Sequence, residues 1–217
     1  MLRRFIFTIL AVIFAAAALY AQEKAQPRKP NTRPAEKQAA EPFEKTDVKT
    51  MAAQCVTFDT ESGSIVMEMF PESAPESVRS FLNLAATGAL DTTTFSRVVP
   101  DFVIQGGDLY TREGQMTAAL GLRARKAVPD EPNKILHERG ILSMARTDEP
   151  NSATTNFFIL VTSAPFLDGK FAAFGRVTAG MEVVDAINKA PTVDEKPAKP
   201  VRIKKASVAP CAAPQSS

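Results

Sequence analysis

Residues 95–108 place one arginine in an apolar, β-prone segment that ends in a Gly-Gly turn. Arg97 has phenylalanines and valines around it in the sequence. A guanidinium is always charged and presents five N–H donors in a fixed fork, so at the edge of an apolar surface it could address a polar atom beside a bound ring. The alternative is an arginine that buries its aliphatic stem and keeps its charged end in water.

Other common arrangements of catalytic residues are missing from the sequence. There is no G-x-S-x-G motif for acyl transfer, and Gly106-Gly107 lacks the further spacing of a phosphate-binding loop. The single histidine, His137, has no partners at zinc-binding spacing, so we expect no metal and no cofactor. Ser143 follows His137 closely, but this separation alone does not indicate a catalytic triad. Arg97 and its apolar surroundings remain the strongest candidate.

Short strands and two helices are predicted to position this segment. Alternating apolar residues and turn-forming residues predict strands over 55–59, 64–70, 94–99, 102–105, 141–145, 156–161, 171–177 and 201–208. Apolar residues at helical spacing after Pro75 predict a helix over 75–87, and a second helix is predicted over 181–188. This pattern favours a mainly β fold, a closed barrel or sandwich with helical lids. Residues 191–200 are expected to form a loop.

The composition divides the chain into four parts. Residues 1–21 have the layout of a secretory signal peptide, with two arginines, an apolar run and small residues; an uncleaved anchor is the alternative. Residues 22–50 are rich in Pro, Lys and Ala and predict a disordered linker. The folded domain is expected over 51–211, and residues 212–217 are expected to be a disordered tail.

Charge and cysteine content bear on partners and compartment. The net charge is +2, but residues 51–217 carry 17 basic and 19 acidic residues, which does not provide the basic face that nucleic acid requires. We expect no nucleic-acid partner, and membrane contact only if residues 1–21 stay uncleaved. The expected location is periplasmic or secreted, or anchored to the membrane and facing the periplasm. Cys55 and Cys211 bracket the domain, either as a disulfide or as two free thiols.

Four ordered blocks resemble the cyclophilins, the cyclosporin-binding class of peptidyl-prolyl cis-trans isomerases. The blocks are 95–108, 140–146, 151–159 and 166–175, and the resemblance spans residues 55–208. Their Met-Ala-Arg and Asn-Ser-Ala-Thr forms look most like the bacterial branch. The resemblance implies a closed eight-stranded antiparallel barrel capped by two α-helices, acting on proline-containing polypeptides without a cofactor.

Individual roles follow from the resemblance. Arg97 matches the catalytic arginine of the family, and Gln105 matches the glutamine that helps to hold the substrate and orient that arginine. The proline pocket is matched by Phe102, Val103, Phe158 and Leu167, and the strand end beside the bound peptide by Ala145, Arg146 and Thr147. Three further substrate-binding candidates depart from the best-known pattern: Asn156 for a glutamine, Phe166 for a tryptophan and Phe171 for a histidine or tyrosine.

The resemblance also predicts a Cys55–Cys211 disulfide, because the first and last strands of this barrel are expected to be neighbours. We expect a monomer. Two functions stay open: an exported isomerase that assists protein folding, and a binder of proline peptides or chaperone that has lost catalysis. Arg97 favours the first function, whereas Asn156 and Phe171 leave room for the second.

Overall fold

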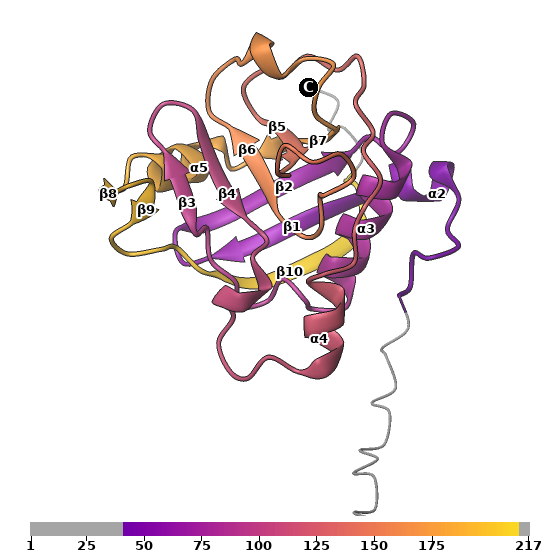
Figure 1. Ribbon diagram of the computed structural model, residues 1–217, viewed down its shortest axis with the longest axis horizontal. Helices are drawn as coiled ribbons and strands as arrows, with labels where there is room; N and C mark the ends of the chain where they lie inside the picture. The colour runs from indigo at the N-terminus through magenta and orange to yellow at the C-terminus, as the bar shows by residue number, and fades with distance from the viewer. Residues whose placement is uncertain (1–40, 213–217) are drawn as a thin grey trace, which may run out of the picture. The chain divides into compact units, whose positions relative to one another are not determined.

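The computed structural model describes residues 41–212 (Figure 1). The expected signal segment 1–21, the first part of the expected linker and residues 213–217 lie outside the described residues. Among the helices that are described, none has the length and apolar character needed to cross a membrane.

An antiparallel sheet of eight strands is the framework of the domain, in the spatial order β10-β1-β2-β7-β5-β6-β4-β3. These strands are β1 (Gln54–Thr60), β2 (Gly63–Met69), β3 (Arg97–Val99), β4 (Val103–Gly106), β5 (Ile141–Met144), β6 (Phe157–Leu160), β7 (Ala173–Ala179) and β10 (Ile203–Pro210). The helices are α2 (Val48–Ala52), α3 (Pro75–Ala86), α4 (Ala118–Arg123) and α5 (Met181–Asn188), with single 3-10 turns η1 (Leu109–Thr111) and η2 (Pro165–Leu167). Strands β8 (Thr192–Val193) and β9 (Lys196–Pro197) form a separate hairpin.

The hairpin of β1 and β2 follows from the alternation of apolar residues. Val56 and Phe58 of β1 are fully buried, as are Ile65 and Met67 of β2, and the residues between them are less buried. Gly63 closes the turn at φ +130°, a backbone conformation that favours glycine. One face of this long hairpin is therefore fixed against the core.

Helix α3 begins and packs for reasons that are visible in its sequence. Pro75 occupies the first turn, and the backbone N–H groups of the next two residues donate to the carboxylate of Glu131 at 2.9 and 2.8 Å. On its buried face, the ring of Phe81 lies 5.2 Å from that of Phe157 and 5.0 Å from that of Phe174. These two residues of β6 and β7 are fully buried and belong to the core.

The sheet is an open half-barrel, so the prediction of a closed barrel is wrong. Strands β10 and β3 are its two ends and do not pair with each other. The chain just before β3 makes one isolated bridge, between Thr94 and Arg202, and the N–H of Val98 in β3 donates to the carbonyl of Glu195 at 2.8 Å. Strand β3 is short and is bonded to the turn between β8 and β9, so it does not continue the ladder to β10. The two expected helices are α3 and α5; α2 and α4 are additional.

The folded part of the chain begins before residue 51. The sequence predicts a disordered linker to residue 50, but residues 41–50 lie against the domain. Glu41 pairs with Arg123 at 2.9 Å, and Arg79 donates to the carbonyl oxygens of Phe43 and Thr46 at 2.6 and 2.8 Å. Phe43 and Val48 of this segment also pack against the core, but composition gives little signal for the ion pairs and backbone carbonyl bonds.

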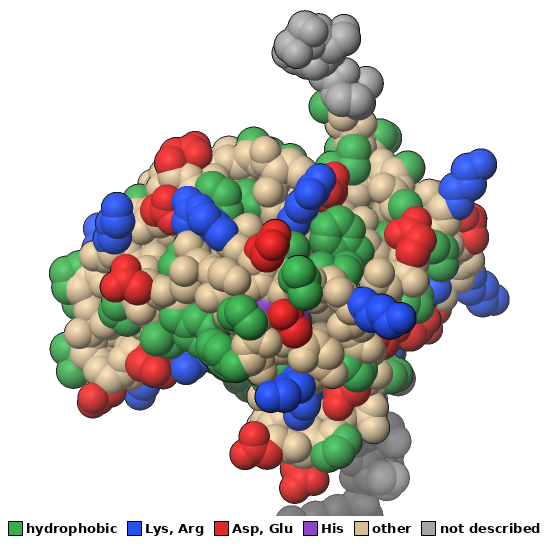
Figure 2. Space-filling model, turned by 90° about the horizontal axis from the view of Figure 1, so that it is seen from above, with side chains coloured by type: hydrophobic (Ala, Val, Ile, Leu, Met, Phe, Trp, Pro, Cys, Tyr) green, Lys and Arg blue, Asp and Glu red, His purple; other side chains and the backbone are tan. Residues whose placement is uncertain are grey.

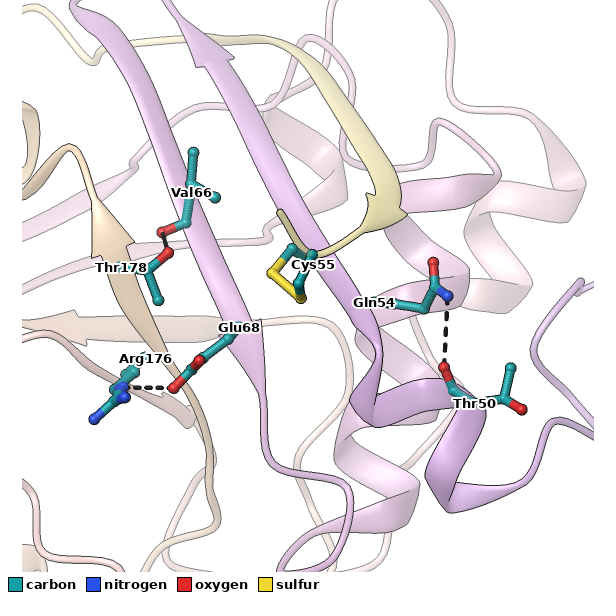
Figure 3. Close-up of a disulfide and its surroundings, with 8 residues drawn as sticks. Thr50, Gln54, Cys55, Val66, Glu68, Arg176 and Thr178 are labelled. Atoms are coloured by element: carbon teal, nitrogen blue, oxygen red, sulfur yellow. Dashed lines mark hydrogen bonds and ion pairs between the residues drawn. A yellow bond between two sulfur atoms is a disulfide. The ribbon is translucent and has the colours of Figure 1, made fainter. Parts of the chain in front are cut away.

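A disulfide joins the two ends of the domain. Cys55 lies in β1, and Cys211 directly follows β10, the strand beside it (Figure 3). Their Cα atoms are 4.8 Å apart, and the N–H of Cys211 donates to the carbonyl of Ala53 at 2.9 Å. The bond closes a loop with a sequence separation of 156 residues. It therefore ties the start of the sheet to its last strand.

Candidate active site

Three neighbouring strands bring the expected catalytic residues into one row. In the antiparallel registers of β3, β4 and β6, Arg97 lies opposite Gln105, and Gln105 lies opposite Phe158. Side chains that are opposite each other on paired strands point to the same face of the sheet. Val103 shares this face, because it precedes Gln105 by two residues.

The two faces of these strands have separate apolar surroundings. Val98, Ile104 and Ile159 are fully buried and belong to the main core. Val103 and Leu160, on the opposite face, belong to a second and smaller apolar cluster. The site is therefore built on a sheet that is anchored from behind and has an apolar floor of its own.

A pocket of about 160 Å³ opens over this row. Its lining residues are Arg97, Phe102, Val103, Gln105, Ala145, Arg146, Phe158, Leu167 and Phe171, all of them expected site residues. A larger hollow of about 200 Å³ beside α3 is lined mostly by charged and polar side chains and by no aromatic ones. The smaller pocket combines an aromatic and aliphatic surface with hydrogen-bond donors.

Arg97 is held at two of its three nitrogens. Its Nη1 donates to Oε1 of Gln105 at 3.1 Å, and its Nε donates to Oε2 of Glu195 at 2.7 Å. Within residues 41–212 no acceptor is bonded to Nη2. The side chain is 42% exposed, so the guanidinium is accessible at the pocket. No sequence signal marks Glu195, which is 98 residues from Arg97 and lies in the turn of the β8–β9 hairpin, where the sequence predicts a loop over 191–200.

Aromatic contacts fix the far wall of the pocket. The ring of Phe171 meets that of Phe158 edge to face, with centroids 6.1 Å apart. The guanidinium carbon of Arg146 lies 4.9 Å from the centroid of the Phe171 ring, a cation–π arrangement. Arg146 also donates to the carbonyl oxygens of Thr147 and Lys170 at 2.8 and 3.3 Å. This wall is therefore apolar inside and charged at its rim.

A residue of α5 fixes the turn that carries Phe102. Asn188 donates through Nδ2 to the carbonyls of Val99 and Val103, at 2.8 and 3.1 Å, and its Oδ1 accepts from the N–H of Asp101 at 2.9 Å. Asp101 has φ +58°, so the turn is a tight one that depends on these bonds. Helix α5 thereby positions the front edge of the pocket.

Three expected site residues do not line the pocket. Thr147 bonds to Oγ of Ser152 through both its N–H and its hydroxyl. The backbone carbonyl of Asn156 accepts a hydrogen bond from the N–H of Ala145 at 3.0 Å. Phe166 is 61% exposed, and its ring centroid lies 5.6 Å from that of Phe102 at the pocket rim.

Apolar side chains are also exposed away from the rim. The large ones are Tyr110, Leu122, Leu136 and Val193. Figure 2 shows one face of the molecule, where apolar patches lie between separate basic and acidic side chains and no block of one charge is seen. On that face, a ligand would meet apolar surface and charges of both signs.

Behind the pocket wall, His137, Ser143 and Asp168 come together. Nδ1 of His137 is 3.0 Å from Oδ1 of Asp168, and Nε2 is 3.2 Å from Oγ of Ser143. This is the connectivity of a hydrolytic triad, but His137 and Ser143 are buried and the hydroxyl also donates to the carbonyl of Ala172 at 2.9 Å. The network instead fixes Asp168, which directly follows the pocket residue Leu167.

The same network affects the charge of Asp168. The backbone N–H of His137 donates to its carboxylate at 2.7 Å and, with the imidazole, holds the pKa of Asp168 below its usual range. An ionised Asp168 therefore keeps both bonds to His137. Among the residues that the structure describes, no group of three or more His, Cys, Asp or Glu side chains is arranged to hold a metal ion.

Comparisons with known proteins agree with this geometry. The family model described as "Cyclophilin type peptidyl-prolyl cis-trans isomerase/CLD" matches residues 55–208. The chain is 37% identical over 158 residues to the isomerase cypE of Dictyostelium discoideum, covering 72% of this chain and 99% of that protein. It is 35% identical over 163 residues to an isomerase of Acinetobacter baylyi, covering 70% and 84%.

A solved structure gives the same result. A cyclophilin-type isomerase of Cryptosporidium parvum, crystallised in the presence of the dipeptide Ala-Pro, superposes with a TM-score of 0.62 at 30% identity. The match covers 71% of this chain and 98% of that one. The chain therefore belongs to the cyclophilin-type peptidyl-prolyl cis-trans isomerase family. It is an enzyme of that class, and peptidyl-prolyl isomerisation is its activity.

Proposed function

We propose that the protein accelerates rotation about Xaa-Pro bonds of exported polypeptides and so assists their folding, with Arg97 as the catalytic donor and Gln105 as its partner. The observation that carries the proposal is a guanidinium beside a small apolar pocket, with its Nη2 bonded to no acceptor within residues 41–212. The Cryptosporidium structure with Ala-Pro supports a proline-containing peptide as the ligand.

The barrier to this reaction is electronic. Rotation about a peptide bond costs about 18–20 kcal/mol because it breaks amide resonance. The two isomers of an Xaa-Pro bond differ by only about 0.5–1 kcal/mol, so the obstacle is the rate. As the bond twists, the prolyl nitrogen becomes pyramidal and recovers its lone pair. A donor aimed at that nitrogen stabilises the twisted state more than either planar one, which is what catalysis requires.

The pocket residues supply an apolar surface for the proline ring and a water-excluding environment for the donor. Phe102, Val103, Phe158 and Leu167 provide an apolar surface that we propose grips the pyrrolidine ring while the preceding carbonyl swings. Exclusion of water from that surface strengthens the interaction of Arg97 with the nitrogen. A hundred-thousandfold acceleration requires about 7 kcal/mol, at about 1.4 kcal/mol for each factor of ten.

The residues at the rim are proposed to bind the rest of the peptide. Ala145 and Arg146 line the end of the pocket beside β5, where an extended chain could lie. Thr147, Asn156 and Phe166 lie outside the lining, so we propose that any contact they make is with residues flanking the proline.

Replacement of Arg97 by alanine tests this function. We expect Arg97→Ala to lose most of the isomerase activity in a protease-coupled assay on a short Xaa-Pro peptide. Arg139→Ala is the matched control, because Arg139 is also an exposed, paired arginine but bonds to Asp185 away from the pocket. Equal rates in wild type and Arg97→Ala would exclude this mechanism. Binding of proline peptides without acceleration of their isomerisation would indicate the non-catalytic binder.

We also propose that the protein is an exported bacterial form and acts as a monomer in the periplasm or outside the cell. The signal-like residues 1–21 support export, and so does the disulfide, because disulfides persist in oxidising compartments. We expect the mature protein to lack residues 1–21 when its mass is measured from a bacterial host. Recovery of the full-length chain in membranes would indicate the anchor, and a cytoplasmic protein retaining Met1 would contradict export.

A further inference from the structure

We propose that Glu195 is a positioning residue for Arg97, which it holds so that Nη2, without an acceptor among residues 41–212, faces the substrate. The proposal rests on the proposed role of Arg97. It adds a residue from a part of the chain that the family signature around 95–108 does not include, and it explains how an exposed arginine keeps one orientation.

The first observation is that one residue binds β3 in two ways. The carboxylate of Glu195 accepts from Nε of Arg97 at 2.7 Å, and its backbone carbonyl accepts from the N–H of Val98 at 2.8 Å. These are consecutive residues of the strand. The β8–β9 hairpin is therefore fixed to the edge of the sheet at the position where Arg97 projects from it.

The second observation is the backbone conformation of the hairpin turn. Asp194 and Glu195, which connect β8 to β9, have φ values of +49° and +62°. Two left-handed residues are what a two-residue hairpin turn requires, but the conformation is unfavourable for residues that carry a Cβ. Such strain persists where surrounding contacts fix it, and here those contacts are the two bonds to β3.

The geometry of the guanidinium explains what the contact does. An arginine side chain that is 42% exposed has many rotamers available. Because the guanidinium is planar, bonds at both Nε and Nη1 fix its plane as well as its position. Gln105 provides the bond at Nη1 and Glu195 provides the bond at Nε. Without Glu195 a single bond remains, about which the group can turn.

Three substitutions separate the side-chain contact from the turn and from the charge. Glu195→Gly removes the carboxylate, keeps the carbonyl bonded to Val98 and suits the left-handed backbone. Glu195→Gln keeps an oxygen acceptor without the charge. Asp194→Asn is the matched control, because it removes the same charge from the neighbouring turn residue, which makes no hydrogen bond or ion pair within residues 41–212.

The experiment measures kcat and KM separately on an Xaa-Pro peptide, and records the Nε–H signal of Arg97 by NMR without substrate. We expect Glu195→Gly to lower kcat about fivefold, the factor that corresponds to an exposed ion pair of about 1 kcal/mol, with KM unchanged. Its Nε–H should exchange faster with water than in wild type. Glu195→Gln should retain most of the wild-type kcat, and Asp194→Asn should match wild type.

The outcomes distinguish this inference from the proposed function. An active wild type with an unchanged or raised kcat in Glu195→Gly would overturn the role of Glu195 alone. An equal loss in Asp194→Asn would also overturn it, because the effect would then come from the charge of the turn. A wild type without isomerase activity would overturn the proposed function, and with it the Glu195 inference.

Discussion

Arg97→Lys separates the charge of the proposed catalytic side chain from its geometry. The arginine reaches two acceptors on different elements, Gln105 on β4 and Glu195 in the β8–β9 turn. A lysine carries its three donors on one nitrogen at the end of a flexible stem, so it lacks the planar fork that reaches both acceptors from separate nitrogens. It is also more strongly hydrated. We therefore expect a positive charge to remain near the pocket without a fixed donor.

The size of the expected loss in kcat follows from the removal of one preorganised donor. Removal of one preorganised donor from a catalytic site typically costs about a hundredfold to a thousandfold in kcat. Arg97→Ala should fall in that range. Arg97→Lys keeps the charge, so we expect a smaller loss, about tenfold to a hundredfold.

Loss of folded protein cannot account for a change of that size. The Arg97–Glu195 pair is exposed, with side chains 42% and 47% accessible, so it contributes at most about 1 kcal/mol to stability. A domain with about 5–15 kcal/mol of stability stays almost entirely folded after such a loss. The expected shift in Tm is about 2–4 °C or less.

The assay compares kcat/KM of the three proteins on one Xaa-Pro peptide at low temperature, where the uncatalysed reaction is slow. Thermal unfolding followed by circular dichroism checks that each variant is folded. If Arg97→Lys were as active as wild type, a positive charge alone would be sufficient. The fork geometry of Arg97, with its bonds to Gln105 and Glu195, would then not be required for catalysis.

Three other perturbations test the parts of the fold that support the site. Replacing Cys55 and Cys211 by serine should cost about 3–5 kcal/mol, given the long loop that the disulfide closes, as measured by urea unfolding. Asp168→Asn should lower stability at neutral pH, and the difference from wild type should vanish in acid. The pKa of Asp168 is depressed by His137, so its contribution is present above the unfolded-state pKa and lost as the pH falls through the folded-state value. Phe158→Leu removes an edge-to-face contact of about 1 kcal/mol and should raise KM with a smaller change in kcat.

Much of the fold could be predicted because its elements are specified locally. The β1–β2 hairpin, α3 and α5 follow from alternation, helical spacing and turn residues close by in the sequence. Helix α4 has only six residues, and its last residue, Arg123, is held by Glu41 and by the carbonyl and hydroxyl of Ser80. Short elements fixed by such distant contacts leave little signal in a local pattern.

The residues of the site also divide into those that the sequence predicts and those that it does not. Arg97, Gln105 and Phe158 could be found because the family blocks cover them and the strand register brings them together. Glu195 could not, because nothing around it differs from a solvated loop. Phe166 is predicted as a site residue from the family block 166–175, but it lies at the pocket rim. The η2 turn directs the next residue, Leu167, into the pocket instead.

The position of Arg97 is set by the same alternation that forms the core. Val98 and Ile104 are fully buried on one face, and Arg97 and Gln105 are their neighbours in sequence, so they must point to the other face. A slip of one residue in the β3–β4 register would expose two apolar side chains and bury a guanidinium. The burial of Val98 and Ile104 therefore excludes that slip, and the register that stabilises the sheet is also the one that aligns the proposed catalytic donor with its pocket.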